Sequence, residues 1–210
     1  MKILLASSSS GSRGGGEIFL LYLGRGLQQL GHEVVLWAAD DKRMDELASA
    51  FNEFGDVRRE RYRNTYSRKL RSLSAYCDHE VSRELAKSWN DIGPDVILIN
   101  KQNLEDGHEL VRASLELSIP SALTIHLTQS EAELKAVGGR LRDFFAALVL
   151  YSFRGPMVAV EKDRARALSD FLGKRDSIYT IPNGVADNEY ATEDIVRIRL
   201  GILNQYQWAS

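Results

Sequence analysis

Short apolar segments alternate along the chain with longer segments in which apolar residues recur at helical spacing. The short segments predict strands at residues 2–6, 33–38, 95–100, 122–126, 157–160 and 178–181, with a weaker strand near Val57. The longer segments predict helices at residues 17–30, 42–53, 65–90 and 105–117, and one further helix on each side of residues 157–160. Strands that are apolar throughout and separated by helices indicate a parallel sheet covered on both faces. We therefore predict an α/β fold with a doubly wound, Rossmann-like parallel sheet.

The residues that follow the predicted strands are the candidates for a functional site, because ligands of such sheets bind beyond the carboxyl ends of the strands. These candidates are residues 7–16, Asp40, residues 101–103, residues 126–130, Glu161 and Asn183. The glycines of the first segment and His126, which ends a strand at this edge, are the most informative among them.

The composition is that of an ordinary globular protein, with 44% apolar and 27% charged residues in a chain of 210. A net charge of −2 argues against nucleic-acid binding by the chain as a whole. Cys77 is the only cysteine, which excludes a disulfide framework and fits a reducing cytoplasm. The longest apolar run, residues 144–151, is far shorter than the about 20 residues that span a bilayer. We predict a cytoplasmic protein that can still touch the inner face of a membrane.

A glycine-rich loop joins the first predicted strand to the first predicted helix. Gly14, Gly15 and Gly16 let the backbone approach a ligand, and the helix that follows presents unpaired N–H groups at the positive end of its dipole. A phosphate group suits this arrangement. The spacing is neither the dinucleotide fingerprint, because Phe19 stands where its last glycine would be, nor a Walker A loop. A flexible turn with no ligand is the alternative.

Several short motifs occur in an order that resembles the family 4 retaining glycosyltransferases, which have the GT-B fold. They are Gly14-Gly15-Gly16-Glu17, Leu30-Gly31-His32-Glu33-Val34, Gly93-Pro94-Asp95-Val96, Ile119-Pro120, Leu123-Thr124-Ile125-His126, Met157-Val158-Ala159-Val160 and Ile181-Pro182-Asn183-Gly184-Val185. The similarity covers nearly the whole chain. It implies that residues 1–185 form the acceptor-side N-terminal domain. Residues 186–210 would then be the interdomain linker and the start of a donor-binding domain that is missing here.

The resemblance also implies roles for site residues. Backbone N–H groups of Gly14, Gly15 and Gly16 would bind the diphosphate of a nucleotide-sugar donor. His126 would lie between the acceptor and the transferred sugar, as the catalytic candidate. A structural role for His126 behind the site is the alternative.

Weaker candidates come from the other loops at the same edge. Lys101 and Asn103 follow one predicted strand and Thr128 and Gln129 follow the next, which makes these four residues candidates for acceptor binding. A solvated loop is the alternative for the first pair. Asn183 and Gly184 are the predicted hinge to the second domain.

A basic segment precedes the middle of the chain. Its seven cationic residues are Arg58, Arg59, Arg61, Arg63, Arg68, Lys69 and Arg71. Five other residues of this region recur at helical spacing and predict one packed helix face, namely Tyr62, Tyr66, Leu70, Leu73 and Cys77. Three interpretations remain open: a solvated charged face, a patch for an anionic membrane surface, and a contact with an anionic acceptor or nucleic acid.

Two departures from the family pattern bear on function. No serine stands between Val160 and Glu161, where the family usually has one. The donor-binding domain, with its nucleotide pocket, is also missing, so we expect the chain to fold but not to catalyse by itself.

Our leading hypothesis is a half of a glycosyltransferase that moves a sugar with retention from a nucleotide-sugar to a glycan, a lipid-linked acceptor or a small polyol. It would act with the missing C-terminal domain in cis or in trans. The alternative is a non-catalytic half that pairs with a separate donor-binding subunit. A nucleotide-dependent oxidoreductase is a third reading, supported by Asp40 at the end of a strand. We predict no metal and no other cofactor, because no cluster of His, Asp and Glu has ligand spacing.

Overall fold

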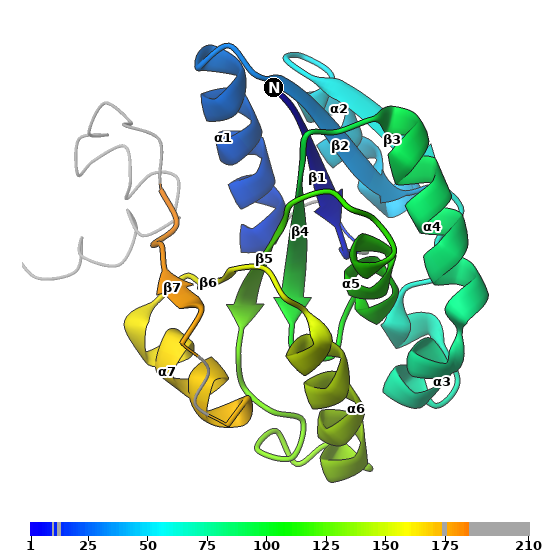
Figure 1. Ribbon diagram of the computed structural model, residues 1–210, viewed down its shortest axis with the longest axis vertical. Helices are drawn as coiled ribbons and strands as arrows, with labels where there is room; N and C mark the ends of the chain where they lie inside the picture. The colour runs from blue at the N-terminus through cyan, green and yellow to red at the C-terminus, as the bar shows by residue number, and fades with distance from the viewer. Residues whose placement is uncertain (10, 12–13, 174–175, 185–210) are drawn as a thin grey trace, which may run out of the picture.

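The computed structural model describes residues 1–184 except residues 10, 12–13 and 174–175. Seven strands form one sheet in the order β3-β2-β1-β4-β5-β6-β7, and every neighbouring pair is parallel (Figure 1). The strands are β1 (Lys2–Ser7), β2 (Glu33–Ala39), β3 (Asp56–Glu60), β4 (Val96–Asn103), β5 (Ser121–Leu127), β6 (Met157–Ala159) and β7 (Ile178–Thr180). The predicted doubly wound parallel sheet is therefore confirmed, including the weak strand near Val57.

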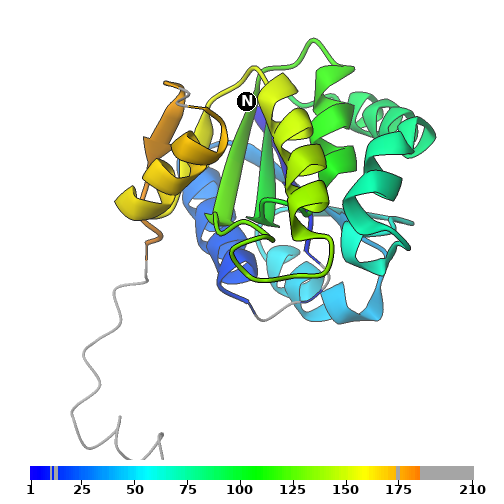
Figure 2. The ribbon, with the colours of Figure 1, turned by 90° about the horizontal axis from the view of Figure 1, so that it is seen from below.

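Helices cover both faces of the sheet. They are α1 (Gly15–Gln29), α2 (Asp45–Phe51), α3 (Arg71–Cys77), α4 (His79–Ile92), α5 (His108–Leu115), α6 (Gly139–Ser152) and α7 (Lys162–Phe171), with short 3₁₀ turns at Lys42–Met44 and Thr65–Ser67. Helices α1 and α2 pack on one face, and α4, α5, α6 and α7 pack on the other (Figures 1 and 2). None of the helices in the described part of the chain is long and apolar enough to cross a membrane.

The core has two parts because successive side chains of a strand point to opposite faces of the sheet. On β1, Leu4 and Ala6 pack with the cluster under α4, α5 and α6, whereas Ile3 and Leu5 pack with the cluster under α1 and α2. Gly31, with φ of 83°, ends the α1 segment in the left-handed conformation that the sequence predicts for it.

Strands β1 and β4 are neighbours in the sheet although they are far apart in the sequence. Their register pairs Ser7 with Asn100, so the loop after β1 starts beside the last residues of β4. From this pair the chain winds outward in both directions, to β2 and β3 on one side and to β5, β6 and β7 on the other. A crevice for ligands is expected at such a switch point, beyond the carboxyl ends of the strands.

The single basic helix predicted over residues 65–90 is wrong. The segment is divided into a 3₁₀ turn, α3 and α4. Leu70 and Arg71 have positive φ values of 62° and 38°, and the Asp78 side chain accepts a hydrogen bond from Val81 N and so caps the start of α4. Leu70 is 74% exposed and Cys77 is also exposed, so the predicted packed face does not form.

The seven cationic residues of the basic segment do not share one surface. Arg68 is buried and pairs with Asp78 at 2.6 Å and with Glu109 at 2.7 Å. Arg59, on β3, pairs with Asp45 at 2.7 Å. Others have different surroundings: Arg63 donates to the Ser67 carbonyl, whereas Arg58, Arg61 and Lys69 are exposed and Arg71 is half-buried. A membrane contact through these seven residues together stays a prediction.

A buried group of charged residues connects the end of β4 to α5. Lys101 and Glu109 are fully buried, and Asp106 is nearly so. The Ser8 hydroxyl donates to Asp106 Oδ2 at 2.7 Å. Burial raises the pKa of Asp106 to about 7, and burial lowers the pKa of Lys101 to about 8 although the carboxylates around it act in the opposite direction. Lys101 Nζ has no hydrogen-bond partner among the described residues, so Lys101 acts on its neighbours through its charge.

His108 lies in the same buried region. Its side chain is fully enclosed. Neither ring nitrogen has a hydrogen-bond partner in the described part of the chain. Burial holds the pKa of His108 well below its ordinary value, so the ring is neutral at physiological pH.

We expect Lys101→Met to lower the free energy of unfolding by about 3 kcal/mol at about pH 7.5, because it leaves the buried carboxylates of Asp106 and Glu109 with less compensating charge. The folded-state pKa of Asp106 lies above that of the unfolded chain. Stability from this group is therefore present below about pH 4 and is lost as pH rises through about 7. Without Lys101, more stability should be lost as the pH rises through this range. The substitution should therefore lower the free energy of unfolding less at about pH 5 than at about pH 7.5.

Urea unfolding at both pH values measures this difference, and Lys162→Met on the exposed face of α7 is the control. Equal stability of the two variants at about pH 7.5 would show that Lys101 does not balance the buried acids.

Candidate functional site

The two faces of β4 carry different polar residues beyond its apolar centre. Asn100 and Gln102 point toward α1, where Asn100 Nδ2 donates to the Gly16 carbonyl at 3.2 Å and Gln102 Nε2 donates to Glu17 Oε1 at 3.0 Å. Lys101 and Asn103 point toward the α5 side, in keeping with the alternation of a strand. The glycine loop is therefore held by Asn100 and Gln102, on the opposite face from Lys101.

The N-terminus of α1 starts from Gly14, the N-cap residue, which has no side chain of its own to cap the helix. The Glu17 carboxylate accepts hydrogen bonds from the backbone N–H groups of Gly14 and Glu17, so the N–H groups of Gly15 and Gly16 are the candidates for binding a ligand. The first N–H groups of a helix have no intrahelical acceptor, and together with the helix dipole they favour an anion. Glu17 is only 4% exposed and burial raises its pKa, which reduces the negative charge that this carboxyl group presents near the loop.

The three glycines of this loop differ in the space around them. A Cβ atom on Gly14 would collide with the Glu17 carboxylate, and one on Gly16 would collide with the Gln102 amide. A side chain at either position would therefore require the end of the Glu17 or Gln102 side chain to shift. A Cβ on Gly15 would meet nothing within 4 Å. Packing gives no reason for glycine at this position, whereas a ligand lying against the backbone would.

His126, near the end of β5, is tied to the glycine loop through Asn100. Its Nε2 lies 2.8 Å from Asn100 Oδ1, and its ring packs edge-on against Phe19 of α1 at 5.2 Å. Asn100 Nδ2 donates to the Gly16 carbonyl, so Oδ1 is the acceptor and His126 Nε2 carries the proton. Burial lowers the pKa of His126 below its ordinary value, so the ring is neutral at pH 7 with Nδ1 as an acceptor.

The chain of hydrogen bonds from Gly16 through Asn100 to His126 gives the site its geometry. It brings the N-terminus of α1 and a neutral imidazole to the same edge of the sheet, across the switch point between β1 and β4. The first group can bind an anion, and the second can accept a hydrogen bond from a hydroxyl. The helix N-terminus and the imidazole together could therefore bind a phosphate and accept a proton from a hydroxyl beside it.

Other candidate residues have different surroundings. Asn103 Oδ1 accepts hydrogen bonds from the backbone N–H groups of Glu105 and Asp106, at 3.0 and 2.9 Å, and so shapes the turn before α5. Thr128 is buried and Gln129 is exposed. Two hinge candidates, Asn183 and Gly184, are exposed at the end of the described chain, and the predicted linker 186–210 lies outside the described residues.

Sequence reasoning missed Asn100 and Glu17 as parts of the site, and it included Gln102 only as one of residues 101–103, without its contact to the glycine loop. The alternation of side chains on β4 is the signal that could have separated Asn100 and Gln102 from Lys101. Asp40 is the residue that supported the oxidoreductase hypothesis. Its Oδ1 forms an ion pair with Arg59 Nη2 at 3.5 Å. Within the described ranges, no group of three or more His, Cys, Asp or Glu residues could hold a metal ion.

Comparison with known proteins agrees with this arrangement. Anabaena Alr3699/HepE, solved in complex with UDP-glucose, aligns with a TM-score of 0.65 and 22% sequence identity, over 98% of this chain and 51% of HepE. The apo form of the lipopolysaccharide outer core galactosyltransferase WaaB aligns with a TM-score of 0.55 and 12% identity, over 90% of this chain and 47% of WaaB. The chain thus spans about half the length of these two structures. No curated protein matches it.

The two structural similarities confirm the predicted Rossmann-like fold, with its doubly wound parallel sheet. A sequence match to the family Glycosyltransferase Family 4 runs from residue 13 to residue 189 and includes the glycine loop, Asn100 and His126. Since this match covers most of the chain, the protein belongs to Glycosyltransferase Family 4.

Proposed function

We propose that the chain is the acceptor-side half of an enzyme that transfers a sugar, with retention, from a nucleotide-sugar to an acceptor hydroxyl. The observation that carries this proposal is the hydrogen-bonded chain from Gly16 through Asn100 to His126, which brings the N-terminus of α1 and a neutral imidazole to one edge of the sheet. Family membership supports glycosyl transfer as the general reaction. Retention rests on the resemblance in the motifs.

The donor diphosphate would lie against the N-terminus of α1. The backbone N–H groups of Gly15 and Gly16 would stabilise the negative charge that develops on the departing nucleoside diphosphate, which lowers the barrier as well as binding the donor. The Gly14 N–H donates to the Glu17 carboxylate, so Gly14 would contribute to this site by shaping the loop. The open space beside Gly15 supports this placement. HepE was solved with UDP-glucose, so UDP-glucose is the first donor to test.

His126 would contact the sugar or the acceptor. Asn100 fixes its protonated nitrogen as Nε2, which leaves Nδ1 to accept a hydrogen bond from a hydroxyl group. A neutral ring suits this role, because an imidazolium cannot accept a hydrogen bond. The burial that lowers the pKa of His126 therefore supports the proposed contact.

Catalysis would also require a donor-binding domain, supplied in cis or in trans. The basis for this is that the chain covers about half of HepE and WaaB, at 51% and 47% of their lengths. The tight nucleotide pocket would belong to that second domain, so we expect only weak binding of UDP-glucose by residues 1–210 alone. Acceptor candidates remain glycans, lipid-linked molecules and small polyols, and no cofactor or metal is proposed.

The Gly15→Val variant tests the donor placement. We expect it to fold normally, because a Cβ at this position has open space, and to lose about 100-fold in transfer from UDP-glucose, because the side chain displaces the diphosphate. The rate is measured as release of UDP by the chain together with its donor-binding domain. NMR of the product gives the configuration at the anomeric carbon.

Gly26→Val is the matched control, since Gly26 also lies in α1 with nothing within 4 Å of its Cβ position. Unchanged turnover in Gly15→Val would refute the donor placement. An inverted anomeric carbon in the product would refute retention and leave the donor site standing.

The His126→Gln variant separates the two roles of this residue. The glutamine amide can still donate to Asn100, so a purely structural histidine would be replaced with little change. If His126 contacts the reacting groups, kcat should fall about 100-fold with little change in KM for the donor. His32→Gln, at the turn before β2, is the control. Full activity of His126→Gln would assign His126 to the support of Asn100 alone.

A further inference from the structure

Helix α6 is apolar on two opposite sides. Its inner side is buried against the sheet through Ala146, Val149 and Leu150. A surface helix normally carries polar residues on its outer side. Here the outer side has a stripe of large apolar residues at helical spacing: Leu141, Phe144, Leu148 and Tyr151, which are 57%, 56%, 40% and 73% exposed. Such a stripe indicates that another surface covers this side of α6.

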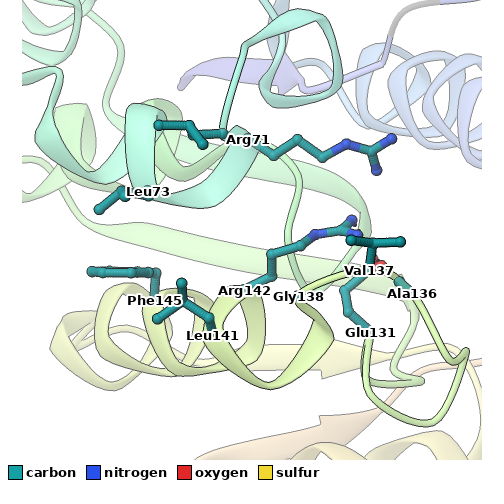
Figure 3. Close-up of a pocket in the computed structure, with 10 residues that line it drawn as sticks. Arg71, Leu73, Glu131, Ala136, Val137, Gly138, Leu141, Arg142 and Phe145 are labelled. Carbon is teal, nitrogen blue, oxygen red and sulfur yellow. Dashed lines mark ion pairs between the residues drawn. The ribbon is translucent and has the colours of Figure 1, made fainter.

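The exposed apolar surface continues into the loop before α6 and the start of α3. Val137 is 96% exposed, Leu70 is 74% exposed and Leu134 is 56% exposed. Between α3 and the first turns of α6 lies an open pocket of about 560 Å³, where Leu73, Leu141 and Phe145 lie together at one end (Figure 3). We call the whole surface the α3–α6 face. It is defined by Leu70, Leu134, Val137, Leu141, Phe144, Leu148 and Tyr151.

The charged residues that border the α3–α6 face are mainly cationic. Lys69, Lys135 and Arg140 adjoin its apolar residues in the sequence and are exposed. Arg71 also adjoins Leu70, but it is half-buried and its Nη1 lies 3.9 Å from Glu105 Oε2, in an ion pair. The acids nearby are fewer and partly engaged. Glu133 accepts from the Ser130 N–H, and Asp143 accepts from the N–H groups of residues 131 and 132. The border of the face is thus positive, although the chain as a whole has a net charge of −2.

Arg142, inside the pocket, does not add to this positive border. It forms ion pairs with Glu105 and with Glu131, the second at 2.7 Å. Its guanidinium lies beside Glu131 and Val137 in Figure 3, at the end of the pocket opposite Phe145. The charge is therefore neutralised within the protein, and the lining of the pocket that remains is chiefly apolar.

We propose that the α3–α6 face docks the protein on an anionic lipid bilayer. The apolar side chains would enter the interface between headgroups and acyl chains, and the bordering cations would bind anionic headgroups, as in amphipathic surfaces that lie on membranes. A second copy of the chain fits less well, because a symmetric dimer would bring the same cationic border against itself. The proposal does not depend on the proposed glycosyl transfer. Of the seven cationic residues of the basic segment, only Lys69 and Arg71 lie beside this face.

Co-sedimentation with vesicles tests the proposal. The chain should sediment with vesicles of phosphatidylcholine and phosphatidylglycerol in equal parts and much less with phosphatidylcholine alone, and added salt should weaken the binding. Substituting aspartate at both Val137 and Phe144 should lower the affinity more than tenfold. Both side chains are exposed, so the fold should persist, which circular dichroism checks. Arg140→Ala should lower the affinity about fivefold, the effect of about one cation near the surface.

Leu30→Asp is the matched control. Leu30 is 74% exposed and lies at the C-terminus of α1, which is the opposite end of the sheet from the start of α6. It should bind vesicles like the unmodified chain. Failure of the unmodified chain to bind anionic vesicles, or equal binding by the double aspartate variant, would overturn the proposal. If light scattering instead shows a dimer that the double variant abolishes, the face is an interface between copies.

Discussion

The parallel pairing of β1 with β4 is the constraint on which the site depends. These strands are the first and fourth in the sequence, yet they are hydrogen-bonded neighbours, with Ser7 opposite Asn100. The Ser8 N–H donates to the Asn100 carbonyl at 3.0 Å and so extends the ladder by one step past the end of β1. The glycine loop therefore leaves the sheet at a fixed position beside β4. A small change in this register would separate Gly16 from the Asn100 side chain.

The end of β4 serves two purposes at once because its side chains alternate. Asn100 and Gln102 hold the α1 side of the crevice, where the hydrogen bonds are to Gly16 and Glu17. Lys101, on the other side, faces the acids of the α5 region in a buried setting where unpaired charge is costly. The cluster of Lys101 and these acids therefore lies on the face of β4 opposite the glycine loop, and it requires a specific arrangement of the turn before α5. This explains why two polar residues adjacent in sequence belong to different parts of the molecule.

Much of the fold could be predicted from the sequence because it depends on local patterns. A window of a few residues is enough to recognise an apolar strand such as residues 95–100 or a turn glycine such as Gly31. The prediction of one helix over residues 65–90 failed because the helix is interrupted by the left-handed backbone at Leu70 and Arg71. The helical spacing of apolar residues does not reveal this interruption.

The candidate site was predictable in part for the same reason. The glycine loop and His126 stand at strand ends, which the pattern alone locates. The role of Asn100 could not be predicted in the same way, because its hydrogen bonds join Gly16 and His126 across three strands and depend on the register of the sheet. Glu17 gains its raised pKa from burial, which only the packed structure determines. Local chemistry therefore identified the ends of the network, and the tertiary fold supplied its centre.

The two proposals, for the crevice and for the α3–α6 face, are linked by the direction of one helix. Helix α6 follows the loop that leaves the carboxyl end of β5, so its first turn lies at the same edge of the sheet as His126 (Figure 1). A protein docked through this face would hold that edge close to the bilayer. An acceptor carried on a membrane lipid could then approach the crevice along the membrane surface, whereas a soluble polyol would gain nothing from docking. Vesicle binding would therefore favour the lipid-linked acceptor among the three acceptor classes.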